Sequence, residues 1–65
     1  MITTVKETEN FRLNRGSLQS EGLYNLEKLN TNQISYWFDS DEAEEMIESS
    51  DEMFEELASL HNFYD

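Results

Sequence analysis

The stretch that decides the fold reads DSDEAEEMIESSDEMFEELASL and runs from residue 39 to residue 60. Its apolar side chains recur at steps of three and four, which is the spacing of one face of an α-helix. Asp39 stands at the start with Glu42 three residues later, a pattern typical of a helix capping box. The stretch therefore predicts one amphipathic helix of about 20 residues within 39–62. The apolar face comprises Ala43, Met46, Ile47, Ser50, Met53, Phe54, Leu57 and Leu60.

A serine pair in the middle of this stretch leaves a second interpretation open. Ser49 and Ser50 are followed by Asp51 and Glu52, and a serine before acidic residues is typical of a helix N-terminus. A break here would give two helices in place of one. We favour the single helix, because the apolar spacing continues through the serines without a shift.

The N-terminal part of the chain contains two segments typical of short strands. Residues 2–8 are rich in threonine and valine, and residues 11–13 alternate apolar and polar side chains. Both features predict strands. The Asn-Arg-Gly-Ser sequence at 14–17 predicts the loop that follows the second strand.

A short helix and a further strand are predicted before the acidic stretch. Leucines at 18, 23, 26 and 29 could mark one face of a helix over 20–29, although Gly22 disfavours it. Asn30-Thr31-Asn32 predicts a turn. Residues 33–38 alternate strictly enough to be the best strand candidate, with Ile34, Tyr36 and Phe38 on one face.

Together these segments predict an α+β fold: a small antiparallel sheet with a short helix and a long acidic C-terminal helix. We expect one domain over 1–65, with a charge-neutral part at 1–38 and an acidic amphipathic helix in 39–65. A chain of 65 residues without cysteine has little core and no disulfides to support it. The sequence therefore favours a homodimer, formed through an apolar surface with the acidic faces outward.

The net charge of −11 lies entirely in the C-terminal part of the chain. Residues 1–38 contain four acids and four bases, whereas residues 39–65 contain eleven carboxylates and no Lys or Arg. This asymmetry predicts a cationic partner. The candidate partner-binding residues lie on the outward face of the predicted helix: Asp41, Glu42, Glu44, Glu45, Glu48, Asp51, Glu52, Glu55 and Glu56.

The spacing of these carboxylates suggests what the partner binds. Acids three or four positions apart repel one another on a helix, at a cost of roughly 2–5 kcal/mol for the set. Residues 41–56 would span ~22 Å of one helix, giving one charge per ~2.5 Å against ~1.7 Å for duplex DNA. Such a row of carboxylates would imitate the phosphates of DNA. The alternative interpretation is that the acidic surface is only solvated and binds no partner.

Catalysis, metal binding and cofactors are not expected from this sequence. Cysteine is absent and His61 is the one histidine, so no nucleophile–base set is suggested. The Asp39-Ser40-Asp41 sequence opens like a calcium loop. However, Glu44 and Ser50 stand where an EF-hand needs Gly and Glu. We expect a non-enzymatic protein whose acidity disfavours direct contact with nucleic acid or anionic membranes.

In size, acidity and lack of catalytic residues, the chain resembles the small acidic inhibitors made by bacteriophages, many of which imitate DNA. The resemblance implies a DNA-binding host protein as the target and the host cytoplasm as the location. A membrane span is not expected, because no apolar stretch approaches ~20 residues. Two alternatives stay open: an antitoxin or adaptor that neutralises a basic protein without imitating DNA, and an interaction domain that binds through Trp37, Phe63 and Tyr64.

Overall fold

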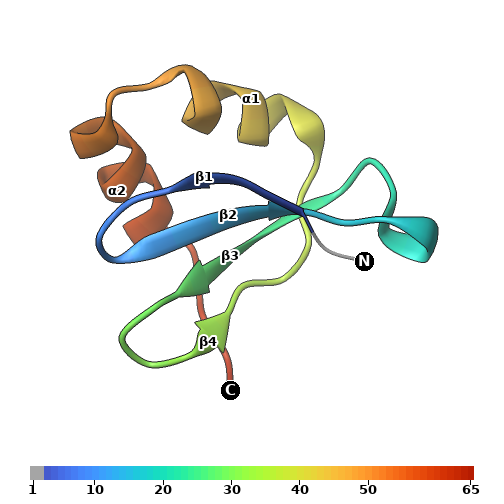
Figure 1. Cartoon of the computed structure of the whole chain (residues 1–65), viewed down its shortest axis with the longest axis horizontal. Helices are drawn as coiled ribbons and strands as arrows, with labels where there is room; N and C mark the ends of the chain where they lie inside the picture. Colours follow the sequence, from blue (N-terminus) through green and yellow to red (C-terminus); the bar gives the residue numbers. More distant parts are fainter. Residues whose placement is uncertain (1–2) are drawn as a thin grey trace.

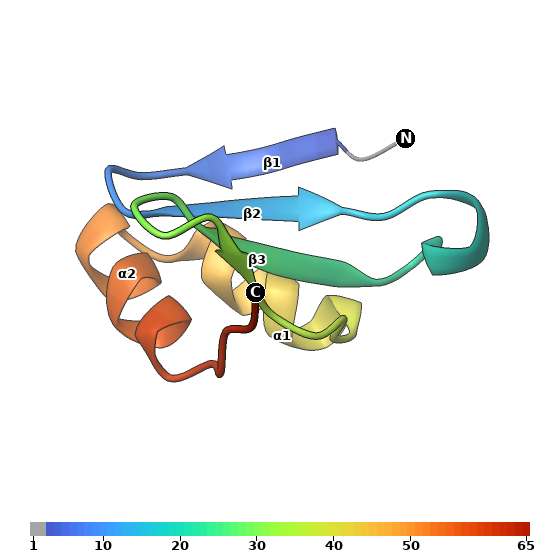
Figure 2. The same ribbon diagram turned by 90° about the horizontal axis from the view of Figure 1, so that it is seen from below.

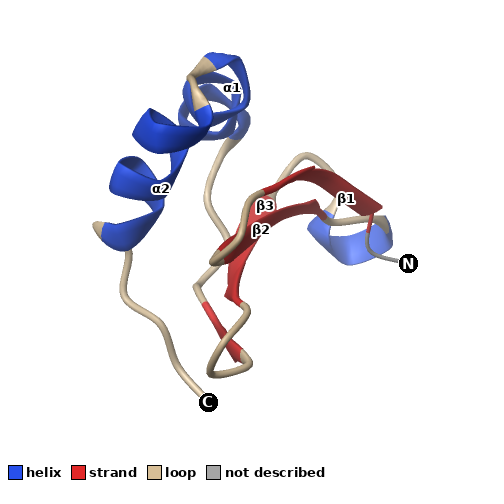
Figure 3. Ribbon diagram, turned by 60° about the vertical axis from the view of Figure 1, so that its left-hand side comes forward, coloured by secondary structure: helices blue, strands red, loops and turns tan. Residues whose placement is uncertain are grey.

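Two helices pack against one face of a four-stranded antiparallel sheet (Figures 1 and 3) in the computed structural model, which describes residues 3–65. Each strand pairs with its neighbour in sequence, in the order β1-β2-β3-β4, so β1 lies at an edge of the sheet (Figure 2). The predicted α+β class with a small antiparallel sheet is therefore confirmed. The elements are β1 (Thr3–Glu7), β2 (Phe11–Arg15), a 3₁₀ turn (Leu18–Ser20), β3 (Tyr24–Lys28), β4 (Gln33–Ile34), α1 (Ser40–Glu48) and α2 (Asp51–Ser59).

The core lies between the helices and the two central strands. Side chains from β2 and β3 alternate across the sheet, so Leu13 and Leu26 pair with each other and face the helices. Met46 of α1 and Phe54 of α2 meet them from the other side, and all four side chains are almost fully buried. Burial of each such side chain stabilises the fold by roughly 1.5–3 kcal/mol.

The acidic stretch forms two helices of nine residues each, so the prediction of one long helix is wrong. The start of α1 agrees with the prediction, since the Asp39 carboxylate accepts a hydrogen bond from the Glu42 N–H at 3.2 Å. At the break, the Ser50 hydroxyl accepts from the Met53 N–H at 3.1 Å and caps α2. Because Ser49 and Ser50 both adopt extended backbone angles, the helix cannot continue through them.

The predicted helix over 20–29 is also wrong, because residues 24–28 form the central strand β3. The leucine spacing suggested a helix, yet in the strand only Leu26 enters the core, while Leu18 lies exposed in the 3₁₀ turn. Gly22 has φ +86, which suits the turn before the strand. The pairing of β3 with both β2 and β4 outweighs the local preference of these residues for a helix. The predicted loop at 14–17 begins later, since β2 runs through Arg15.

The predicted strand at 33–38 forms only in part. β4 contains Gln33 and Ile34, and a separate bridge joins Phe38 to Tyr24 of β3. Between them, the Ser35 hydroxyl accepts a hydrogen bond from the Leu26 N–H at 2.9 Å, where a strand would offer a carbonyl. The ladder is interrupted there, and residues 35–37 belong to no strand. The predicted turn at 30–32 lies between β3 and β4, with Asn32 in the left-handed region.

Candidate functional site

The predicted partner-binding carboxylates all lie on the two helices, α1 and α2. Eight of them are exposed, and the ninth, Glu55, is half-buried. The helices carry no Lys or Arg, so nothing within their own sequence neutralises these charges. We call the exposed set the acidic surface: Asp41, Glu42, Glu44, Glu45, Glu48, Asp51, Glu52 and Glu56.

The break between the helices lowers the repulsion within the acidic surface. Asp51 and Glu52 lie in the first turn of α2, where the helix dipole favours negative charge. Asp41 and Glu42 occupy the same position in α1. Glu48 ends α1, so it no longer faces Asp51 and Glu52 on one continuous helix. The electrostatic cost is therefore smaller than that of the single helix the sequence predicts.

Lys6 organises the break, a role that the sequence did not indicate. Its ammonium donates hydrogen bonds to three carbonyls at the end of α1: Met46 O at 3.1 Å, Ile47 O at 3.1 Å and Ser49 O at 2.6 Å. The same ammonium lies 5.1 Å from the centre of the Phe54 ring of α2. Lys6 thus supplies from the sheet the cation that the last turn of α1 lacks.

A β-bulge in β1 points Lys6 at the helices. Thr4 pairs with Asn14 and Lys6 pairs with Leu13, so Val5 is an extra residue in the ladder. Val5 packs against the core, and Lys6 stands opposite Leu13, which faces the helices. Strict alternation would place Val5 and Lys6 on opposite faces. Only the register of the sheet reveals that both approach the helical layer.

The three other basic side chains stay with the sheet. Arg12 lies on the face away from the helices and forms ion pairs with Glu7 at 2.9 Å and Glu27 at 3.2 Å. Both interactions raise the pKa of its guanidinium, and the interaction with Glu7 has the larger effect. The ammonium of Lys28 lies 5.8 Å from the centre of the Phe63 ring. Arg15 ends β2 beside the 3₁₀ turn. Consequently, no Lys or Arg among residues 3–65 forms an ion pair with the acidic surface.

Glu55 serves an internal contact that ties α2 to the turn between β1 and β2. Its carboxylate accepts hydrogen bonds from the Asn10 backbone N–H at 3.1 Å and from the Asn10 side-chain amide at 2.9 Å. The Thr8 hydroxyl, and then these Asn10 groups, hold the pKa of Glu55 below its ordinary value of 4.5. Of the nine predicted residues, Glu55 is therefore the least available to a partner.

The depressed pKa of Glu55 predicts a pH-dependent contribution to stability. A carboxyl with a lower pKa in the folded state stabilises the fold above its unfolded pKa, near 4.5, and loses this effect as pH falls through the folded pKa. We expect Glu55→Gln to lower the free energy of unfolding at pH 7, and the difference from the wild type to shrink as the pH falls below 4.5. Urea unfolding across this range measures the difference. The neighbouring exposed Glu56→Gln is the control, and an equal pH profile for the two variants would contradict the prediction.

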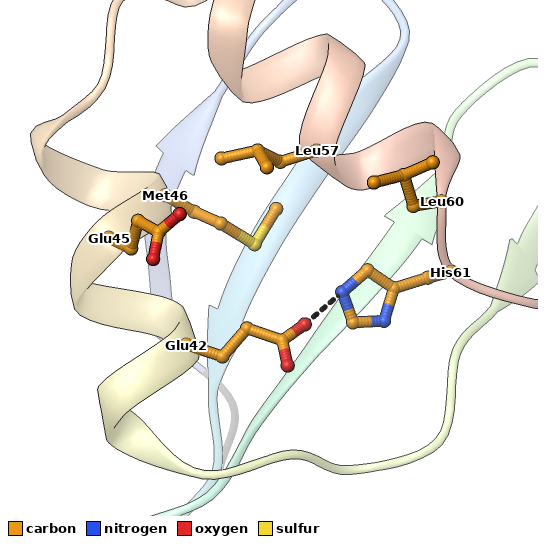
Figure 4. A pocket seen from close by; sticks show the side chains of 6 residues that line it. All are labelled: Glu42, Glu45, Met46, Leu57, Leu60 and His61. Atoms are coloured by element: carbon orange, nitrogen blue, oxygen red, sulfur yellow. Dashed lines mark ion pairs between the residues drawn. The ribbon is translucent and has the colours of Figure 1, made fainter.

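A hollow lies between the helices, and Figure 4 shows the side chains that line it. Its volume is about 360 Å³. Glu42 forms an ion pair with His61, with 2.5 Å between Oε2 of Glu42 and Nε2 of the imidazole. The centre of this imidazole ring lies 4.7 Å from the centre of the Phe38 ring. The contact between Glu42 and His61 was not predicted from the sequence. The hollow is lined by Glu42, Glu45, Met46, Leu57, Leu60 and His61.

A second surface, near β4 and the C-terminus, exposes aromatic rings. Tyr36 is 71% exposed and stacks on Tyr64 with 4.4 Å between ring centres. Tyr64 is held there because its backbone exchanges hydrogen bonds with Ile34 at 2.8 and 2.9 Å. Trp37 is partly exposed beside them. Phe63, expected at the surface, instead packs on the core with its ring 5.7 Å from that of Phe11.

No group of three or more acidic or histidine side chains within 3–65 is placed to hold a metal ion. None of the helices formed by these residues has the length and apolar character needed to cross a membrane. Comparison of the chain with protein-family models, curated proteins and solved structures gives no match.

Proposed function

We propose that this protein is a non-enzymatic, phage-type inhibitor that imitates DNA and occupies the DNA-binding surface of a basic host protein. The observation that carries the proposal is the separation of charge between the two layers. The helical layer presents eight exposed carboxylates, while all four Lys and Arg residues belong to the strands. An ordinary exposed helix would intersperse bases at four-residue spacing and gain attraction in place of repulsion.

The geometry supports a partner that normally binds phosphates. Carboxylates on successive turns of each helix rise by ~5.4 Å, comparable to the spacing between neighbouring phosphates of a strand. Because the chain turns between α1 and α2 (Figure 1), the charges follow a bent path instead of a straight rod. The helices are fixed on the sheet by their apolar faces, so the charges are held in place before binding and steer the encounter.

Competition with DNA tests this proposal. Immobilised protein should capture a basic DNA-binding protein from bacterial lysate, and a salt gradient should release it steeply, because ionic contacts with many charges are screened together. Duplex DNA should displace the captured protein, with longer duplexes more effective. Capture of a basic protein that DNA does not displace would contradict mimicry and would favour an antitoxin or adaptor.

The exposed aromatic rings favour a second candidate, an apolar interface that includes the homodimer expected from the sequence. Tyr36, Trp37 and Tyr64, which are all exposed, would provide this interface. Association through these rings would persist at high salt, in contrast to binding through carboxylates. Sedimentation equilibrium in high salt measures it, and a monomer at tens of micromolar would exclude the dimer.

A further inference from the structure

The hollow between α1 and α2 combines an apolar floor with a charged rim. Met46 is almost fully buried at its base, and Leu57 and Leu60 come from the end of α2. Glu42 and Glu45 enter from α1 (Figure 4). Leu60 is 77% exposed, an unusual position for a large apolar side chain on so acidic a surface. A volume of about 360 Å³ lies at the lower end of the roughly 300–1,000 Å³ range of ligand pockets.

We infer that this hollow is the anchor point for one arginine side chain of the basic partner. The inference rests on the proposed function and adds to it a defined contact within the acidic surface. The aliphatic stem of the arginine would pack on Met46, Leu57 and Leu60, and its guanidinium would reach the rim carboxylates. The limited volume suits a single long side chain better than a helix or a base pair.

The two rim carboxylates differ in what they offer a guanidinium. The carboxylate of Glu42 already pairs with His61. The carboxylate of Glu45 accepts no hydrogen bond and forms no ion pair within residues 3–65, although it stands over the same hollow. Glu45 is therefore the principal acceptor, and the Glu42–His61 pair forms the adjacent wall.

Arginine fits this environment better than lysine does. Its guanidinium is planar, binds a carboxylate through two parallel hydrogen bonds and is less strongly hydrated than an ammonium. A site in which Met46, Leu57 and Leu60 form half of the lining penalises a strongly hydrated ion such as an ammonium. The hollow should thus discriminate between the two basic side chains.

Methyl NMR of the whole protein tests the inference without the target. N-acetyl-arginine amide should cause saturable shifts of the Met46, Leu57 and Leu60 methyl groups at low salt. N-acetyl-lysine amide should bind at least about threefold more weakly, and N-acetyl-norleucine amide should cause no saturable shift. Glu45→Gln should weaken arginine binding about fivefold, whereas Glu44→Gln, which removes the same charge outside the hollow, should change it less than about twofold.

Three results would overturn the inference. Equal loss in the Glu44→Gln and Glu45→Gln variants would mean that only total charge matters. Equal shifts with arginine and lysine amides would mean that the hollow does not prefer arginine. Shifts that depend on protein concentration alone would mean that a second copy of this chain occupies the hollow. Because DNA competition is measured separately with the target, failure of the arginine site would leave mimicry standing. Arginine binding without DNA competition would contradict mimicry alone.

Discussion

Replacing Glu44, Glu45, Glu48, Asp51 and Glu52 together by glutamine or asparagine should abolish binding to the basic target while the fold survives. Exposed charge pairs are each worth about 1 kcal/mol or less, so the loss should accumulate over several residues. The slope of affinity against salt should flatten at the same time, since fewer ions exchange on binding. Affinity measured at several salt concentrations, with circular dichroism of the variant, checks both expectations.

The stability of this variant should stay close to that of the wild type. Removing Glu44, Glu45 and Glu48 relieves repulsion within α1, whereas Asp51 and Glu52 favour the start of α2 by about 0.3–1 kcal/mol each. The stability gained from less repulsion in α1 therefore offsets the stability lost at the start of α2.

A control of equal charge separates the acidic surface from net charge. The double variants Glu44→Gln/Glu48→Gln and Glu9→Gln/Glu21→Gln remove the same number of carboxylates, but Glu9 and Glu21 lie outside the helical layer. Only the first pair should weaken binding. A folded fivefold variant that still competes with DNA would exclude the proposed function.

Changing Lys6 to Met should lower the free energy of unfolding by about 2 kcal/mol, because hydrogen bonds to a charged group are worth about 1.5–3 kcal/mol and this ammonium is partly exposed to water. The thioether side chain keeps the apolar packing of the lysine stem, so the loss reports the ammonium itself. A domain of this size has only about 3–5 kcal/mol of stability in all. Urea unfolding should therefore show a large fall in the midpoint.

Lys28→Met is the matched control for Lys6→Met. Lys28 lies over one aromatic ring, a contact worth about 0.5–1 kcal/mol at an exposed site. If the two variants lose the same stability, the hydrogen bonds from Lys6 to the end of α1 do not hold the break. If Lys6→Met keeps the wild-type midpoint, the break is held by the serines alone.

Several features of the candidate site were predictable because they depend on residues close together in sequence. The Asp39 cap, the buried positions Ala43, Met46 and Phe54, and the turn at 30–32 follow from spacing and from side-chain chemistry within one turn of the chain. The exposure of the acids also followed from the helical period. The engagement of Glu55 with Asn10 did not, because Asn10 lies 45 residues away.

The sequence by itself determined the charge asymmetry, the helical character of the acidic stretch and the α+β class, since composition and short-range periodicity are sufficient for these. Only the tertiary structure decided that the helix does break at the serine pair, that residues 24–28 are a strand, and that Glu42, Glu45 and Leu60 share a hollow. Each of these depends on contacts between distant residues, such as that of Lys6 with Met46, 40 positions later. A bulge of one residue in β1 sets that contact, and no local preference of the helix encodes it.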